Sequence, residues 1–442
     1  MACLGRCNEN LNNMAYQYKM KLSEEQKAIL EGAQGPVKAK VMETIVRYGD
    51  MFEASELVAV THGKGHLVTS FGLSLLKPVY RTMDELIGAG LKVEEGFTMD
   101  PRPSDFENTP CTLLDKILLK TILYGKQEKY EEQLEKLGLV DKDAFSCACY
   151  FDEMGNIPGK GDILSWAESS AVNYANSVLG ARCNRNSGMI DIFGSIIGYV
   201  PKFGLLTDEG RKAKWKVTVN TKKKPLPQIL GSAIGIKVME DVPYVVGLDK
   251  WIGTELNDEC KAYLKDFGAA TASNGAVGLY HVENITPEAV EQGQALLEEG
   301  YKEYVIDDEE LERVYKSYPN IWRKPDLPGN VAFIGCPHLS AIQLEDWTDR
   351  IVASLKDSGN ERVTVDTVLF TAPPVREKFV GTEKYQLLTK AGVKVSSICP
   401  LMYTSNPLTK ARRIMTCSNK LRTYSMARYY KDDELLDIIT GK

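Results

Sequence analysis

Residues 161–188 hold a dense set of side chains that could bind a small anionic ligand. Asp162 suits a helix N-cap and Gly180 a C-cap, so we expect one helix between them. Apolar side chains recur at helical spacing along it and give a packing face that includes Ser170. A second face carries small hydrogen-bonding residues where Lys and Glu would be more usual, namely Ser169, Asn173 and Asn176. A buried helix whose small residues allow close packing is an equally good interpretation.

Three polar side chains follow directly after this predicted helix: Arg182, Asn184 and Arg185. The guanidinium group is a planar fork of N–H donors that pairs with a carboxylate or a phosphate. We therefore expect this cluster to anchor the acidic group of a ligand.

Two of the four histidines, His62 and His66, lie in a Gly-rich turn after a strand predicted at residues 57–61. Loops at strand ends are common ligand sites in α/β folds, which makes His62 a candidate for catalysis. His281 lies on another predicted strand, at residues 277–282. For the turn, a plain surface loop is the alternative interpretation.

Three of the ten cysteines, Cys147, Cys336 and Cys399, occur in loop contexts. No pair has zinc-finger spacing, which gives little support for a structural zinc site. Thiolates gathered from distant loops could hold an iron–sulfur cluster. Considered singly, each is as well explained as a small packed residue.

The composition of the chain limits the classes of function. A chain of 442 residues is too long for one core and suggests two to four domains. The net charge of −6 argues against a general nucleic-acid binder. No apolar run reaches about 18 residues, so we expect no membrane span, and the start lacks an apolar signal core. These features favour a cytoplasmic protein whose cysteines are thiols or metal ligands.

The order of predicted elements divides the chain into an α/β protein of several units. Residues 1–20 look like a leader, and 21–200 form an α/β domain around the small-residue helix. A second α/β domain is expected at 201–325, and the Pro/Gly-rich stretch at 323–329 is the clearest linker. Beyond it, strands and helices alternate through 326–442, which is typical of a doubly wound α/β domain. Cys336 and Cys399 follow strands of this domain, where an open parallel sheet places its site.

Five sequence blocks resemble the large subunit of aconitase X. They are ESSAVNYANSVLGARCNR (168–185), HVENITPEA (281–289), IGCPHLS (334–340), AGVKVSSICP (391–400) and TCSNK (416–420). The resemblance is in order and covers residues 23–430. It implies an aconitase-like fold of several three-layer α/β/α domains, a mobile fourth domain, an iron–sulfur cluster of [4Fe-4S] or [2Fe-2S] type, and hydro-lyase activity.

Carried over position by position, the resemblance makes Cys147, Cys336 and Cys399 the cluster ligands. This chain departs from the family pattern at Cys149, where a proline is usual, and also at Cys183 and Cys417. The expected catalytic residues are His62, His281, His338, Ser340 and Lys420. The expected substrate-binding residues are Ser169, Ser170, Asn173, Asn176, Arg182, Asn184, Arg185 and Ser418.

The function implied is the dehydration of a small hydroxy acid, with open iron as a Lewis acid for the departing hydroxyl group. The substrate favoured is cis-3-hydroxy-L-proline, and the alternative is mevalonate 5-phosphate. Two other hypotheses are a non-catalytic iron-binding protein and a metal-free enzyme. Nucleic-acid binding is disfavoured because the chain has no basic aromatic stripe.

The resemblance also implies a partner. Family members carry a Gly-Ser-Ser-Ser loop on the fourth domain, and no such loop is found in this sequence. We therefore expect the chain to be inactive alone and to need a small swivel-domain subunit that closes the site.

Overall fold

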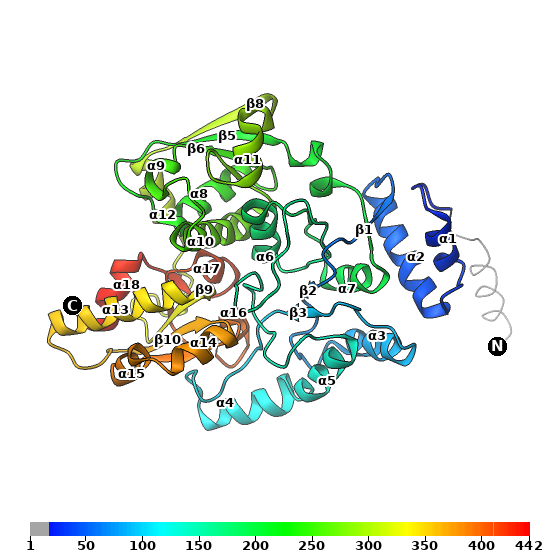
Figure 1. The fold of residues 1–442 in the computed structure, drawn as a ribbon. Coiled ribbons are helices and arrows are strands. Elements are labelled where there is room, and N and C mark those ends of the chain that lie inside the picture. The colour runs from blue at the N-terminus through cyan, green and yellow to red at the C-terminus, as the bar shows by residue number, and fades with distance from the viewer. Residues whose placement is uncertain (1–16, 410) are drawn as a thin grey trace.

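The computed structural model describes residues 17–409 and 411–442 of the protein (Figure 1). Within these residues, its N-terminal unit consists mainly of helices, with four short strands. Residues 1–16 of the predicted leader lie outside this range, but Met20 is already buried in the first core. Strand β1 pairs with β4 antiparallel, and β2 pairs with β3 in parallel. The elements are α1 (Glu24–Leu30), α2 (Pro36–Met51), β1 (Leu57–Ala59), β2 (Gly65–Leu67), α3 (Lys77–Gly88), β3 (Phe97–Met99), α4 (Leu113–Leu118), the π-helix η1 (Leu119–Leu123), α5 (Gln127–Leu137), α6 (Ser169–Tyr174), the π-helix η2 (Ala175–Leu179), α7 (Gly188–Ile197) and β4 (Tyr199–Pro201).

The second unit is a four-stranded parallel sheet in the order β7-β6-β5-β8. Alternation along β6 sends Tyr244 to one core and Val245 to the other. Helices therefore cover both faces, α8 and α10 on one and α11 on the other. The elements are η3 (Gly204–Leu206), η4 (Glu209–Arg211), β5 (Ala213–Val219), α8 (Pro227–Val238), β6 (Pro243–Val246), α9 (Asp249–Ile252), α10 (Asp258–Gly275), β7 (His281–Val282), α11 (Pro287–Gln292), η5 (Gly293–Leu296), β8 (Leu297–Ile306) and α12 (Asp308–Lys316).

The third unit is a five-stranded parallel sheet in the order β11-β10-β9-β12-β13. In β9, Ala332 and Ile334 face one core while Val331 and Phe333 face the other. This is the period of two that puts successive side chains on opposite faces of a sheet. The elements are β9 (Val331–Leu339), α13 (Ala341–Ser358), β10 (Asp366–Thr371), α14 (Pro373–Val380), α15 (Glu383–Lys390), β11 (Lys394–Ser396), α16 (Pro400–Ser405), β12 (Ile414–Thr416), α17 (Asn419–Tyr424), β13 (Arg428–Tyr429) and α18 (Asp432–Thr440).

The predicted helix of residues 162–180 is correct at its C-terminal end and wrong at its start. Gly180 ends it at φ 72°, in the left-handed conformation expected of a C-cap. The helix begins only at Ser169, because the Glu168 carboxylate accepts the Ala171 N–H at 2.6 Å and acts as the N-cap. Residues 162–168 are instead extended, with Ile163 bridging to Arg182 and Trp166 to His66.

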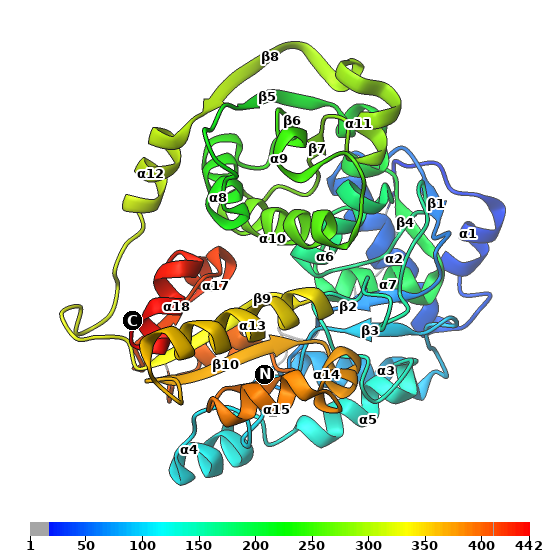
Figure 2. The same cartoon turned by 60° about the vertical axis from the view of Figure 1, so that its left-hand side comes forward.

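The three units meet around α6, α16 and α17, which lie at the centre of Figure 1. Helix α10 of the second unit packs against both α6 and α17 (Figure 2). The C-terminal ends of β9 and β10 point toward the same junction. Within residues 17–409 and 411–442, no helix is long and apolar enough to cross a membrane.

Candidate functional site

A buried ion pair joins the first and third units at the start of two helices. The Lys420 ammonium, on α17, contacts the Glu168 carboxylate that caps α6, and it also donates to Ser170 Oγ at 3.1 Å. The side chains are 10% and 5% exposed. Burial alone would lower the pKa of Lys420, but Glu168 and the nearby Cys336 and Cys147 groups raise it overall. Lys420 is therefore held as an ammonium ion.

The three predicted cluster ligands gather around this ion pair. Burial raises the pKa of the Cys147 thiol, and Glu168 and Cys336 raise it further. Burial likewise raises the pKa of Cys399, again with a contribution from Cys336. The pKa of Cys336 rises to about 11 because of burial, although Lys420 and Ser418 oppose the rise. The thiols of Cys147 and Cys399 thus each lie close enough to Cys336 for its charge to affect their pKa.

His338 braces two of these cysteine loops. Its Nδ1 pairs with Ser146 Oγ at 3.0 Å and its Nε2 with the Ile398 carbonyl at 3.1 Å. Its backbone N–H points at Cys147 Sγ, 3.4 Å away. Since a carbonyl only accepts, Nε2 carries the proton and Nδ1 accepts from Ser146. His338 is buried with both ring nitrogens engaged, so it positions the loops.

His66 and Asp100 place two unpaired polar atoms close to the Lys420–Glu168 pair. His66 Nδ1 pairs with Thr98 Oγ1 at 2.9 Å. His66 Nε2 and Asp100 Oδ1 lie 3.8 Å apart, and neither has a hydrogen-bond partner among the residues that the structure describes. Burial lowers the pKa of His66 to about 4 and raises that of Asp100 well above its usual range, where Glu168 raises it further. Buried polar atoms normally have partners, so this pair suits a polar group of a ligand.

The arginine cluster separates in space. Arg185 contacts the Ala276 carbonyl, and its guanidinium is near enough to Tyr424 and Glu168 for both to affect its pKa, which burial lowers. Arg182 instead donates to Asp208 at 2.5 Å and to the Leu206 carbonyl. Of the two predicted arginines, Arg185 is therefore the one that lies near Glu168.

The other polar residues of the predicted set bind backbone. Asn184 pairs with Phe203 and Leu205, and His281 with the Arg211 carbonyl at 2.8 Å. Asn173 and Asn176 donate to the carbonyls of Val277 and Gly278 in the second unit. Asn173 therefore holds α6, and Asn176 holds η2, against the second unit.

Ser169, Ser418, Ser340 and His62 have separate surroundings. Ser169 Oγ donates to Glu168, and the Ser418 hydroxyl contacts the Cys336 carbonyl and caps α17. Ser340 forms the capping box of α13 with Gln343. His62 Nε2 pairs with Asn156 Oδ1 at 2.8 Å. The two serines next to Glu168 and Cys336 lie with the thiols, whereas Ser340 and His62 serve other local contacts.

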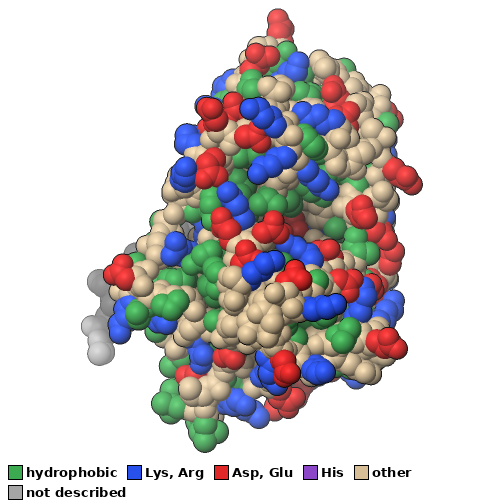
Figure 3. Space-filling model, turned by 90° about the vertical axis from the view of Figure 1, so that its left-hand side faces the viewer, with side chains coloured by type: hydrophobic (Ala, Val, Ile, Leu, Met, Phe, Trp, Pro, Cys, Tyr) green, Lys and Arg blue, Asp and Glu red, His purple; other side chains and the backbone are tan. Residues whose placement is uncertain are grey.

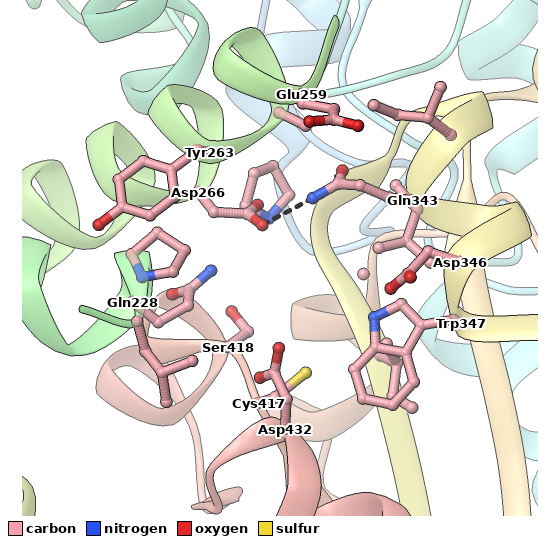
Figure 4. A pocket seen from close by; sticks show the side chains of 18 of the residues that line it. Gln228, Glu259, Tyr263, Asp266, Gln343, Asp346, Trp347, Cys417, Ser418 and Asp432 are labelled. Carbon is pink, nitrogen blue, oxygen red and sulfur yellow. Dashed lines mark hydrogen bonds between the residues drawn. The ribbon is translucent and has the colours of Figure 1, made fainter. Parts of the chain in front are cut away.

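A cavity of about 770 Å³ opens between the second and third units and reaches Cys336 and Ser418. Figure 4 shows Asp266 bonded to Gln343 on one side of it and Asp432 near Cys417 on another. Both acidic and basic side chains border the hollow in Figure 3. The lining of this cavity includes Cys336 but not Lys420, Glu168 or His66. The cavity therefore approaches the buried Lys420–Glu168 pair from the side of Cys336.

Sequence reasoning missed Glu168, Asp100 and the role of His66, and it set Cys149 aside. Cys149 is fully buried beside Thr98, and the Cys147 and Glu168 groups affect its pKa, which burial raises. Glu168 carried one signal, since an acidic residue just before a helical run can be an N-cap. Asp100 lies 68 residues before Glu168 (168 − 100), and no local pattern links them.

The buried groups fit an iron–sulfur cluster by their chemistry. Within the described ranges, no three His, Cys, Asp or Glu side chains lie close enough to hold a single metal ion. A cluster differs because each thiolate binds its own iron, so the sulfurs need only surround a common volume. Burial favours the neutral thiols here, and bound iron would supply the positive charge that stabilises thiolates.

The fold and this site define a three-unit α/β protein whose reactive groups meet at the junction of its units. Models of the Aconitase X first, second and third domains match residues 19–209, 213–316 and 329–433 in order. The chain belongs to the aconitase X family, and it is a hydro-lyase of the aconitase X type.

Named relatives agree with this placement. A phosphomevalonate dehydratase large subunit of Thermococcus kodakarensis is 31% identical over 74% of this chain and 76% of its own. The large subunit of the same name from Methanocaldococcus jannaschii is 27% identical over 92% and 95%. A cis-3-hydroxy-L-proline dehydratase of Hypocrea jecorina is 29% identical over 74% of this chain and 52% of its own.

A solved structure shares the fold. The crystal structure of holo-form aconitase X from Thermococcus kodakaraensis superposes with a TM-score of 0.76 at 26% identity, over 95% of this chain and all of that one. The predicted α/β fold of aconitase type is therefore confirmed.

Proposed function

We propose that this chain is the large, catalytic subunit of an iron–sulfur-dependent dehydratase that removes water from a small hydroxy acid. The observation that carries the proposal is the set of His338 contacts, which hold the loops of Cys147 and Cys399 beside Cys336 and next to the buried Lys420–Glu168 pair. Iron held by these thiolates would supply a Lewis acid for the substrate hydroxyl and carboxylate.

The chain's own residues would bind the substrate and move a proton. The Arg185 guanidinium would anchor an anionic group at the edge of the site, because its planar fork suits carboxylate or phosphate. Lys420, fixed by Glu168, adds positive charge beside the thiols. A hydroxyl group between His66 Nε2 and Asp100 Oδ1 would meet an imidazole nitrogen and a carboxyl group whose neutral form is favoured by burial, since burial raises the pKa of Asp100.

Phosphomevalonate is the first substrate to test, although the sequence alone favoured cis-3-hydroxy-L-proline. The dehydratases of the two substrates are 27–31% and 29–30% identical to the chain, which does not separate them. Coverage favours the former, since the chain matches 95% of one phosphomevalonate dehydratase large subunit but 52% and 33% of the hydroxyproline dehydratases. The name "large subunit" in these relatives also supports a small partner chain.

The test is to purify the chain with its small subunit without oxygen and to measure iron, sulfide and dehydration of both substrates. Cys336→Ser should lose iron and activity together, while Cys260→Ser, a buried thiol of α10, should keep both. Dehydration by preparations that contain no iron would contradict the cluster, and full activity of the chain alone would contradict the need for a partner. Dehydration of hydroxyproline alone would select the second substrate.

A further inference from the structure

Helix α4 and the segment after it expose large apolar side chains to an unusual degree. Every residue of α4 lies outside the core, and in η1 only Leu119 is buried. Leu113 and Ile122 are 75% and 66% exposed, and Leu75, in a neighbouring loop, is 79% exposed. The surface we name the α4 patch consists of Leu75, Leu76, Leu113, Leu114, Ile117 and Ile122.

The two segments of the α4 patch are joined in space. The Ser74 N–H donates to the Leu123 carbonyl at 2.9 Å, which holds the loop bearing Leu75 against the end of η1. Helix α4 lies at the edge of the molecule in both Figure 1 and Figure 2. Hydrophobic side chains also gather at the lower end of the surface in Figure 3, at the level of α4. A short helix gains most of its stability from packing an apolar face, and α4 packs none of its own side chains in the core.

The segment that carries the α4 patch is linked at both ends to the Cys399 side of the proposed site. The loop before α4 is held by Tyr403 of α16, whose hydroxyl donates to the Pro110 carbonyl, and Cys399 is the N-cap of α16. At the other end, Tyr124 follows η1. Burial raises the pKa of Tyr124, and Cys399 lies close enough to raise it further. A chain that covers the patch would therefore lie next to Cys399.

Within the two segments that carry the α4 patch, the charged side chains are almost all basic. In residues 72–81 and 111–126 the one acidic side chain is Asp115, which pairs with Arg412 at 3.3 Å. The basic side chains of these segments are Lys77, Arg81, Lys116, Lys120 and Lys126. An apolar centre with a basic rim suits a protein face with apolar side chains ringed by carboxylates.

We propose that the α4 patch is the docking surface for the small subunit. The small subunit would bind it with an apolar face of its own that is bordered by acidic side chains. The proposal rests on the proposed function for the existence of that partner, and it adds the place where the partner binds. Docking there would cover the Cys399 side of the site, where exclusion of water matters to a dehydratase.

The test is the affinity between the purified chain and the small subunit from the same organism, measured by calorimetry. The variant Leu114→Asp/Ile117→Asp should raise Kd at least about 30-fold, because it places charge at the centre of the patch. The control Val290→Asp/Ile236→Asp changes helix positions of similar exposure in the second unit and should leave Kd within about twofold. Added salt should weaken binding of the parent chain.

The outcomes separate this proposal from the proposed function. If patch variants bind like the parent while the complex dehydrates its substrate, the docking site is wrong and the function stands. If the patch controls binding but the complex holds no iron and no activity, docking stands and the function is wrong. Dimers of the chain alone, or binding to anionic lipid vesicles, that are lost in the patch variant would assign the patch to another occupant and overturn the proposal.

Discussion

His66 and His281 are buried side chains that the fold keeps neutral. Burial lowers the pKa of each to about 4, from an ordinary value of 6.5. His66 faces Asp100, Glu168 and Lys420. Between these pH values the unfolded chain binds protons that the folded chain excludes. The two histidines therefore make the free energy of unfolding fall as the pH decreases from about 6.5 toward 4.

For His281, which faces Arg211 and Glu288, we expect His281→Gln to make that pH dependence shallower. Each histidine contributes a slope of up to about 1.4 kcal/mol per pH unit in this window. Asp100 changes the free energy of unfolding with pH in the opposite direction, because its raised pKa lets the folded chain keep a proton that the unfolded chain loses. Both the parent and the variant contain Asp100, so its contribution cancels when the two are compared. Urea unfolding between pH 7.5 and 4.5 measures the slope, and an equal slope in both proteins would disprove the assignment to His281.

At the residue scale, the sequence pointed to the three cysteines that we propose as ligands and missed the groups that surround them. The three cysteines stand out because each lies in a loop within a distinctive block. Asp100 and Glu168 do not stand out, since their effect comes from burial beside Lys420, which lies 252 residues from Glu168. The placement of Arg185 toward the site and of Arg182 toward Asp208 depends on side-chain directions that spacing cannot specify.

At the element scale, the third unit was the easier part to predict. Its strands alternate with helices, and residues of β9 alternate between two cores, so pattern and fold agree. The first unit was harder because its strands are three residues long and the site segments between them are irregular. The start of α6 was misplaced because Asp162 resembles an N-cap as much as Glu168 does.

Helices α8 and α10 pack closely through glycines, and this packing makes a prediction. A Cβ added at Gly231 would lie 2.3 Å from the Phe267 carbonyl oxygen, whereas at Gly88 of α3 nothing lies within 4 Å. We expect Gly231→Ala to lower the free energy of unfolding by about 1–3 kcal/mol. Gly88→Ala should raise it by about 0.5–1 kcal/mol, through helix propensity alone. Thermal and urea unfolding compare the two, and equal effects would mean that the helices separate at little cost.

At the scale of the whole molecule, the third unit is tied to both others by buried polar groups. Lys420 pairs with Glu168 of the first unit, and the neighbouring Asn419 bonds twice to Gln228 of the second. Both residues lie at the start of α17. One short helix therefore couples the stability of all three units.

Removal of the ammonium should show this coupling. Lys420→Met leaves the Glu168 carboxylate buried without its partner, which we expect to cost about 3–5 kcal/mol. The double variant Glu168→Gln/Lys420→Met should recover most of the loss, because no buried charge remains unpaired. Lys431→Met, which breaks a half-exposed pair with Glu312, is the control and should cost less than about 1 kcal/mol. Calorimetric unfolding distinguishes these cases, and a Lys420→Met variant as stable as the control would contradict the coupling.

The brace that His338 forms between Ser146 and Ile398 has a consequence for biosynthesis. It spans 192 residues in one direction and 60 in the other, so neither cysteine loop has its native support until the third unit has emerged from the ribosome and docked. A nascent chain that stops before residue 338 would present Cys147 on an unsupported loop. If the chain carries the cluster proposed above, its insertion would then follow the folding of the third unit.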